Sequence, residues 1–196
     1  MVAITPARKA QHYYLQFQPG EARASPFFLR HTPPMSNAPD AIAFVALGSN
    51  LGDSRALVRQ AMDQLQAFST APLLCSSLWQ SMPVECPPAS PPFINAMAGL
   101  RPPAEETPLT LLHRLQELEA VFGRKPKKIL NEPRLLDLDL IAFGSLVIHH
   151  PELELPHPRA HMRRFVLQPL AEIAPDFVLP GQTQTARELL LSLPPE

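Results

Sequence analysis

The sequence is poor in the residues that define several common protein classes. Its 196 residues include two cysteines, one tryptophan and seven glycines. The two closely spaced cysteines, Cys75 and Cys86, favour a reduced cytosolic chain with packing thiols over a disulfide framework. No apolar run approaches the roughly 20 residues that span a bilayer. We therefore expect a cytoplasmic protein without a membrane partner.

The chain also lacks a strong net charge, which is −1 at pH 7. Such a chain has no overall field that would attract nucleic acid, so we expect no nucleic-acid partner, and any anion must be bound by a local cluster. The sequence contains no P-loop, no Gly-x-Ser-x-Gly elbow and no zinc-type spacing of cysteine and histidine. If the chain binds ATP, it does so without a Walker motif.

Proline, in contrast, is abundant, with 25 residues. This content predicts long, stiff connections between short elements. Residues 1–40 carry several prolines and no sustained hydrophobic period. We expect them to be a disordered extension, or the result of a start codon placed too early. Residues 41–196 are long enough for one domain with its own core, which we expect to be a monomer.

Hydrophobic patterning over residues 41–196 predicts a β-α-β-β-α-β order. The expected strands cover 41–47, 73–80, 93–100 and 136–143, with a short run at 146–148, and the expected helices cover 53–68, 107–123, 165–174 and 186–193. This order is that of a ferredoxin-like α+β sandwich, a mostly antiparallel sheet with helices on one face and a C-terminal helical appendage. Because that fold hosts many functions, the function must be argued from a site.

Two carboxylates stand out in the strand expected at 136–143. Asp137 and Asp139 are two residues apart, so in a strand they point to one face while the intervening leucines point to the other. Two neighbouring aspartates repel each other unless a cation or a basic group lies between them. Mg²⁺ is bound by one or two carboxylates together with substrate phosphates, and the guanidinium of Arg134 suits phosphate. The strand therefore predicts a site for magnesium and a polyphosphate.

A dense basic cluster precedes that strand. It consists of Arg124, Lys125, Lys127 and Lys128. Basic residues at the end of a helix complement its dipole, so a solvated capping run is one interpretation. The neighbouring aspartates favour phosphate binding instead. Gln116 and Glu119 share the polar side of the preceding helix, near its end.

A second group lies around His157, between Pro156 and Pro158. The flanking prolines predict a rigid loop. A single histidine is usually structural or exposed, but His157 and Arg163 together can bind phosphate. His149 and His150 are interpreted as surface residues in a polar turn.

A third group combines an amide with aromatic side chains. Asn95 can donate to and accept from the edge of a planar heterocycle, and Phe93 or Phe165 can stack on its ring. Ser81 and Met82 lead into the proline-rich loop nearby. Taken alone, these residues are better explained by a core phenylalanine and an asparagine at a strand edge.

Taken together and in this order, these residues resemble the 6-hydroxymethyl-7,8-dihydropterin pyrophosphokinase family of the folate pathway. The resemblance runs from about Ile42 to Leu179. The segments that carry it are Ala46–Gly52, Phe93–Ala96, the helix with Gln116, Glu119, Gly123 and Arg124, Pro133–Leu140, Leu155–Pro158 and Arg163–Pro175. So many motifs in one order make coincidence an inadequate explanation.

The resemblance implies a ferredoxin-like fold and transfer of pyrophosphate from ATP to the pterin's hydroxymethyl group, with release of AMP. It implies that Asp137 and Asp139 hold two Mg²⁺ ions and act with Arg134 and His157 as the catalytic group. The implied ATP-binding residues are Gln116, Glu119, Arg124, Lys127, Leu140, His157 and Arg163. The implied pterin-binding residues are Ser81, Met82, Val84, Phe93, Asn95 and Phe165. We assign no general base, because a metal that polarises the hydroxyl serves better.

The chain departs from the family pattern just before Pro133. Leu130, Asn131 and Glu132 stand where a basic residue, an aromatic residue and a glycine are usual. Glu132 adds negative charge beside a polyphosphate, and the loop loses the conformational freedom of glycine. Two alternatives therefore stay open: a catalytically impaired relative that binds pterin or nucleotide, and a non-catalytic ligand-sensing module on a ferredoxin-like scaffold.

Overall fold

The computed structural model describes residues 41–84, 86–87, 89–124 and 133–194. Its main sheet contains five strands: β1 (Ala43–Ser49), β2 (Leu74–Cys75), β3 (Trp79–Ser81), β4 (Phe93–Leu100) and β5 (Asp137–Phe143). The order is β2-β4-β1-β5, and β3 also pairs with β4. Each of these pairings is antiparallel. Since β2 and β3 share one edge position, this is the split β-α-β arrangement of a ferredoxin-like fold, which confirms the expected class.

The strand expected at 73–80 is interrupted between β2 and β3. The backbone N–H of Ser76 donates to the carbonyl of Met97 at 3.0 Å, and the Ser76 hydroxyl, rather than a backbone carbonyl, accepts from the Met97 N–H at 2.9 Å. A side chain that takes the place of a ladder carbonyl breaks the regular pairing. One predicted strand is therefore two short ones, both on β4.

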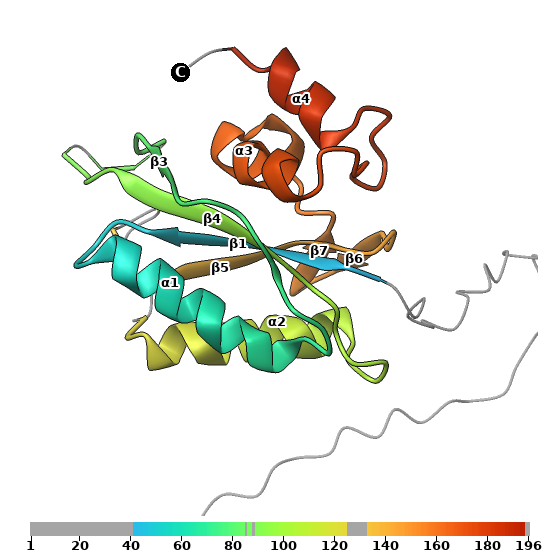
Figure 1. The fold of residues 1–196 in the computed structure, drawn as a ribbon, viewed down its shortest axis with the longest axis horizontal. Coiled ribbons are helices and arrows are strands. Elements are labelled where there is room, and N and C mark those ends of the chain that lie inside the picture. The colour runs from blue at the N-terminus through green and yellow to red at the C-terminus, as the bar shows by residue number, and fades with distance from the viewer. Residues whose placement is uncertain (1–40, 85, 88, 125–132, 195–196) are drawn as a thin grey trace, which may run out of the picture. The chain divides into compact units, whose positions relative to one another are not determined.

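Helices cover both faces of the sheet (Figure 1). Helices α1 (Ser54–Leu65) and α2 (Pro108–Val121) pack on one face, and α3 (Arg164–Ile173) and α4 (Ala186–Ser192) pack on the other. The expected helices on one face are present. The C-terminal appendage forms a second helical layer on the other face of the sheet, where it buries residues such as Phe44 and Met97.

Local capping chemistry sets the ends of α1 and α2. The carboxylate of Asp53 accepts from the N–H of Ala56, and Thr107 forms a capping box with Thr110. Gly123 follows α2 with a φ of +87°, the left-handed conformation that glycine adopts at helix ends. These are the ends that the sequence predicts. A short 3-10 turn, η1 (Gln66–Phe68), extends α1.

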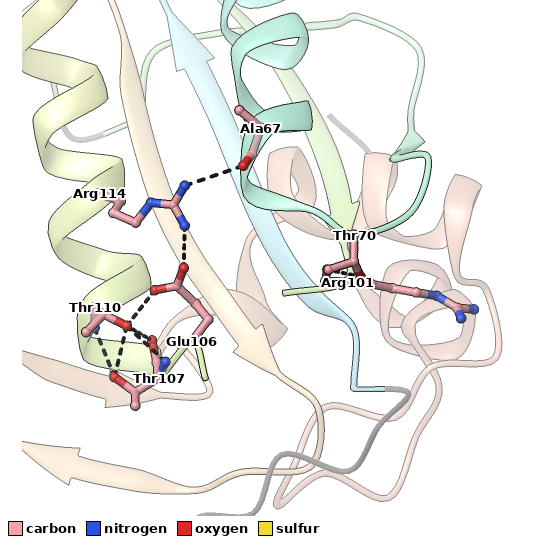
Figure 2. Close-up of polar contacts among 7 residues, drawn as sticks. All are labelled: Ala67, Thr70, Arg101, Glu106, Thr107, Thr110 and Arg114. Atoms are coloured by element: carbon pink, nitrogen blue, oxygen red, sulfur yellow. Dashed lines mark hydrogen bonds and ion pairs between the residues drawn. The ribbon is translucent and has the colours of Figure 1, made fainter. Parts of the chain in front are cut away.

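A buried carboxylate connects the start of α2 to the end of α1 (Figure 2). Glu106 accepts from the hydroxyl of Thr110 at 2.5 Å and forms an ion pair with Arg114. Arg114 also donates to the carbonyl of Ala67 at 3.4 Å, and its guanidinium lies 3.9 Å from the ring centroid of Phe68. This network fixes the two helices against each other at one end of the sheet.

After β5 the chain forms a hairpin of β6 (Ile148–His150) and β7 (Leu153–Leu155). His149 and His150 are exposed as expected, but their placement in a turn is wrong, because they lie in β6 and the turn follows them. A 3-10 turn, η2 (Ala160–Met162), then leads into α3. Within the described ranges, no helix is both long and apolar enough to cross a membrane.

Candidate active site

The two aspartates of β5 lie side by side on the sheet face that α3 covers. Asp137 is opposite Gly48 and Asp139 is opposite Ala46 in the antiparallel register with β1. The leucines at 138 and 140 alternate with them and are buried in the core under α1 and α2. Along this part of β5, the aspartates and the leucines thus point to opposite faces of the sheet, as the sequence alternation predicts.

A cavity of about 490 Å³ opens over these aspartates. Its walls come from β1, β3, β4 and β5, from the loops after β3 and β7, and from the start of α3. The lining residues are Ala46, Leu47, Gly48, Ser81, Met82, Val84, Cys86, Phe93, Asn95, Arg134, Asp137, Asp139, His157, Arg159, Met162, Arg163, Phe165 and Val166. One chamber therefore contains carboxylates, arginines, an amide and aromatic rings.

Two arginines neutralise Asp137. Arg134 Nη1 lies 3.0 Å from Asp137 Oδ2, and Arg124 Nη1 lies 3.3 Å from Asp137 Oδ1. The backbone N–H of Arg134 donates to the side chain of Asn50 at 2.8 Å, which fixes the start of this segment. Among the described residues, the buried Arg134 Nε has no hydrogen-bond acceptor. A buried N–H without a partner favours an anionic ligand at this point.

Burial and the neighbouring charge of Asp137 raise the pKa of Asp139 to about 6, while Arg163, Arg134 and Arg124 oppose the shift. A carboxylate that is costly to ionise is stabilised by a bound cation. Within the described ranges, no cluster of three or more histidine, cysteine, aspartate or glutamate residues forms a metal site by itself. The two aspartates instead fit the usual magnesium arrangement, in which substrate phosphates and water supply the remaining ligands.

Glu119 does not line the cavity. It is buried in α2, accepts from the backbone N–H of Leu138 at 2.7 Å and forms an ion pair with Arg124. Burial raises the pKa of Glu119, and the bonds from Leu138 and Arg124 offset part of that shift. Its carboxylate therefore supports the strand between the two aspartates from the opposite face of the sheet.

The other half of the cavity is suited to a planar heterocycle. Asn95 Nδ2 donates to the hydroxyl of Ser81 at 2.8 Å, and both residues are buried. That bond fixes the amide and leaves its oxygen and second N–H available to a ligand edge. Phe93 and Phe165 are both partly buried in the cavity wall. The Arg163 guanidinium carbon lies 5.4 Å from the ring centroid of Phe165.

His157 faces the cavity from the loop after β7. Its backbone N–H donates to Ile141 at 2.8 Å, and its Nδ1 accepts from the N–H of Arg159 at 3.2 Å. Burial, together with Arg163 and Arg159, lowers the pKa of His157. The ring is therefore neutral at pH 7, with its proton on Nε2, where it can donate to a phosphate oxygen.

Comparison with known proteins adds an independent finding. Residues 44–175 match the family model described as 7,8-dihydro-6-hydroxymethylpterin-pyrophosphokinase (HPPK). The chain belongs to this family. It is 38% identical over 152 residues to the 2-amino-4-hydroxy-6-hydroxymethyldihydropteridine pyrophosphokinase of Pseudomonas aeruginosa, a match that covers 77% of this chain and 91% of the relative. It is also 38% identical to the Haemophilus influenzae protein of the same name, over 76% of this chain and 90% of the relative.

A solved structure of HPPK-DHPS from Plasmodium falciparum has the same fold, with a TM-score of 0.60 at 13% identity. That match covers 77% of this chain and 44% of the other, so the chain spans less than half of that longer protein. This likeness supports the ferredoxin-like fold of the HPPK family.

The cavity brings together most of the residues that the sequence singles out. They are Ser81, Met82, Val84, Phe93, Asn95, Arg134, Asp137, Asp139, His157, Arg163 and Phe165. Four described candidates are not in its wall: Gln116 is exposed on α2, Glu119 and Leu140 are buried, and Arg124 pairs with both Glu119 and Asp137. Lys127, the other loop lysines and the departures at 130–132 lie outside the described residues.

Several lining residues were given no role by the sequence. Three of these unassigned residues have polar or polarisable side chains: Arg159, Met162 and Cys86. Arg159 follows His157 by two residues in the same proline-flanked loop. The sequence pattern that indicates a role for His157 could therefore also have indicated Arg159. Met162 ends the short turn η2 and Cys86 is in the loop after β3, and no local sequence pattern shows which way their side chains point.

Proposed function

We propose that this chain transfers pyrophosphate from ATP to 6-hydroxymethyl-7,8-dihydropterin and forms AMP and the pterin diphosphate, a step of folate biosynthesis. The proposal rests mainly on one structural observation. A single cavity has Asp137 and Asp139 on one wall and the fixed amide of Asn95 with aromatic rings on another. Such a cavity accommodates a polyphosphate and a planar heterocycle together, and the membership of the HPPK family identifies these as ATP and the pterin.

We further propose that Asp137 and Asp139 hold two Mg²⁺ ions together with the phosphates of ATP. The donor set fits, because two adjacent carboxylates provide the hard oxygen ligands that Mg²⁺ requires. When bound, magnesium neutralises the phosphate charge and polarises the attacking hydroxyl.

The protein's own contribution is mainly positioning and charge. Arg134, His157 and Arg163 donate to the phosphates. The Nε of Arg134, which has no hydrogen-bond acceptor in the described part of the chain, supports this assignment. Pyrophosphoryl transfer requires alignment and neutralisation more than covalent participation by the protein, so no side chain is assigned as a base. Val84, in the loop after β3, lines the cavity and is proposed to cover the substrates, which would limit hydrolysis of ATP by water.

The pterin is proposed to lie against Phe165 and Phe93, with Met82 and Val84 covering it. The amide of Asn95 forms hydrogen bonds with the edge of the pterin ring, and the hydroxyl of Ser81 holds that amide in the required orientation. The aromatic faces contribute stacking and exclude water from the ring.

The remaining ATP assignments concern the end of α2 and its loop. Arg124 is next to Asp137 and is proposed to contact phosphate, and Lys127 is proposed to assist. Gln116 stays a proposed contact on the nucleotide side. For Glu119, the role supported by its contacts is to hold β5. Leu140 has a buried side chain, so a contact with ATP would come from its backbone.

The test is a product assay with ATP, Mg²⁺ and 6-hydroxymethyl-7,8-dihydropterin. We expect AMP to form in a one-to-one ratio with pterin diphosphate, and only when the pterin is present. Binding of both substrates without AMP would support the catalytically impaired relative instead. Binding of the pterin without metal-dependent binding of ATP would support the ligand-sensing module. Size-exclusion chromatography tests the proposed monomer.

A further inference from the structure

Two walls of the cavity come from segments that are far apart in the sequence. Ser81 lines it from β3, and Phe165 and Val166 line it from α3. The sheet register fixes Ser81 opposite Phe93, and so fixes β3 relative to β4. Strand pairing does not fix β3 relative to a helix. Helix α3 is held on the sheet by the apolar core that includes Met97 of β4. A direct contact between α3 and the start of β3 would fix the separation between Ser81 and Phe165 more closely.

Glu172 makes that contact. Its Oε1 accepts from the backbone N–H of Ser77 at 2.9 Å and from the Ser77 hydroxyl at 2.7 Å. Its Oε2 accepts from Trp79 Nε1 at 2.8 Å. Both carboxylate oxygens are therefore used, and three hydrogen bonds join α3 to Trp79 at the start of β3 and to Ser77 two residues before it.

The directions of the side chains connect this contact to the cavity. Trp79 is opposite Asn95 in the register of β3 and β4, so its side chain lies on the same sheet face as Asn95 and Ser81. In α3, Phe165 and Glu172 are seven residues apart, about two turns, and so lie on the same side of the helix. One helix side thus presents a cavity residue near its start and the carboxylate near its end.

The charge of Glu172 strengthens these bonds. Partial burial would raise its pKa, but the hydrogen bonds from Ser77 and Trp79 outweigh that effect, and the pKa of Glu172 is lowered. The group is therefore ionised at neutral pH. Hydrogen bonds to a carboxylate are roughly twice as strong as those between neutral groups. A contact of this kind can hold an exposed strand end against a helix.

We propose that Glu172 is a positioning residue for the pterin half of the site. It fixes β3 against α3 and so sets the separation between the Ser81–Asn95 pair and Phe165, although it touches neither substrate. The inference rests on the proposed function. The ATP half is held separately, because Asp137 is fixed from β5 by its bonds to Arg134 and Arg124.

Glu172→Gln is the first test. The amide nitrogen of glutamine cannot accept a hydrogen bond, so the hydrogen bonds to either Ser77 or Trp79 are lost. We expect the KM and the directly titrated Kd for the pterin to rise about tenfold, with kcat and the KM for ATP within about twofold of wild type. Glu188→Gln is the matched control: Glu188 is also an exposed glutamate that accepts from a nearby residue, Thr185, but at the start of α4. It should leave all these values unchanged.

Trp79→Phe removes the donor on the other side of the contact. In that background Glu172→Gln should have a smaller effect than in wild type, because the two changes act on one contact. A pterin KM and Kd that stay within twofold in Glu172→Gln, or an equal rise in the KM for ATP, would overturn the inference. Absence of AMP formation by wild type would overturn the proposed function instead, and the pterin titration would still test Glu172.

Discussion

The carboxylate of Glu119 in α2 accepts a hydrogen bond from the backbone N–H of Leu138 at 2.7 Å. Leu138 lies between Asp137 and Asp139, so a buried helix residue fixes the middle of the strand that carries both cavity carboxylates. Arg124 pairs with Glu119 and with Asp137 at once. Stability and the proposed metal site are therefore connected through this one carboxylate.

Glu119→Ala should lower both stability and turnover. The change leaves Arg124 and the Leu138 N–H without their buried partner, which costs about 2 to 4 kcal/mol of unfolding free energy. Urea denaturation measures this loss. Turnover per folded molecule should also fall, because the strand between the aspartates is no longer held.

Glu106→Ala is the matched variant. Glu106 is also buried and paired with an arginine, Arg114, but it connects α1 and α2 and does not line the cavity (Figure 2). It should cost a similar free energy, about 2 to 4 kcal/mol, and leave turnover of the folded fraction unchanged. Equal turnover losses in the two variants would contradict the account of Glu119.

Asp139→Asn should abolish turnover without destabilising the fold. Loss of a metal ligand removes several kcal/mol of transition-state stabilisation, so kcat should fall by about 10³-fold or more. Because burial and Asp137 raise the pKa of Asp139, its charge is unfavourable in the fold, and the melting temperature should not decrease. Asp63→Asn, an exposed change on α1, is the control. Substantial activity in Asp139→Asn would show that the aspartate is not a metal ligand.

Asn95→Leu should weaken pterin binding selectively. The near-isosteric change removes the amide that is fixed by Ser81 and leaves a ligand edge without its partner. We expect the Kd of the pterin to rise about 100-fold, since an unmade buried hydrogen bond costs about 1 to 3 kcal/mol. Titration of the pterin with and without ATP measures it. An unchanged Kd would mean that the heterocycle lies elsewhere.

His157 should titrate at lower pH than an ordinary histidine. Its lowered pKa means that the folded state disfavours the protonated ring. The corresponding contribution to stability is therefore present above the unfolded-state pKa of about 6.5 and is lost as the pH falls below it. NMR titration of the imidazole, assigned with His157→Gln, measures the midpoint. A midpoint at or above 6.5 contradicts the environment described for His157.

Elements with strong local signals were predictable from the sequence. The strand expected at 93–100 coincides with β4, and the cap at Thr107 and the stop at Gly123 bound α2. The second helical layer also had a signal, because β1 is apolar at successive positions and such strands are buried on both faces. Phe44 and Val45 do face different cores.

Features that depend on distant partners were not predictable. The break between β2 and β3 follows from a side-chain contact of Ser76 with Met97, 21 residues away. Glu119 belongs to the polar set of its helix, yet it points inward to Leu138. Helical periodicity shows which residues share a side, but not which polar residue meets a buried N–H of another element.

Transfer of an intact pyrophosphate group can be tested by following the phosphorus atoms of ATP. Wild-type protein is incubated with the pterin, Mg²⁺ and ATP labelled in turn at the α, β or γ phosphorus. We expect β and γ label both to appear in the pterin product and α label to remain in AMP, with no transfer after chelation of the metal. Transfer of γ label alone, with ADP as the second product, would contradict the proposed transfer.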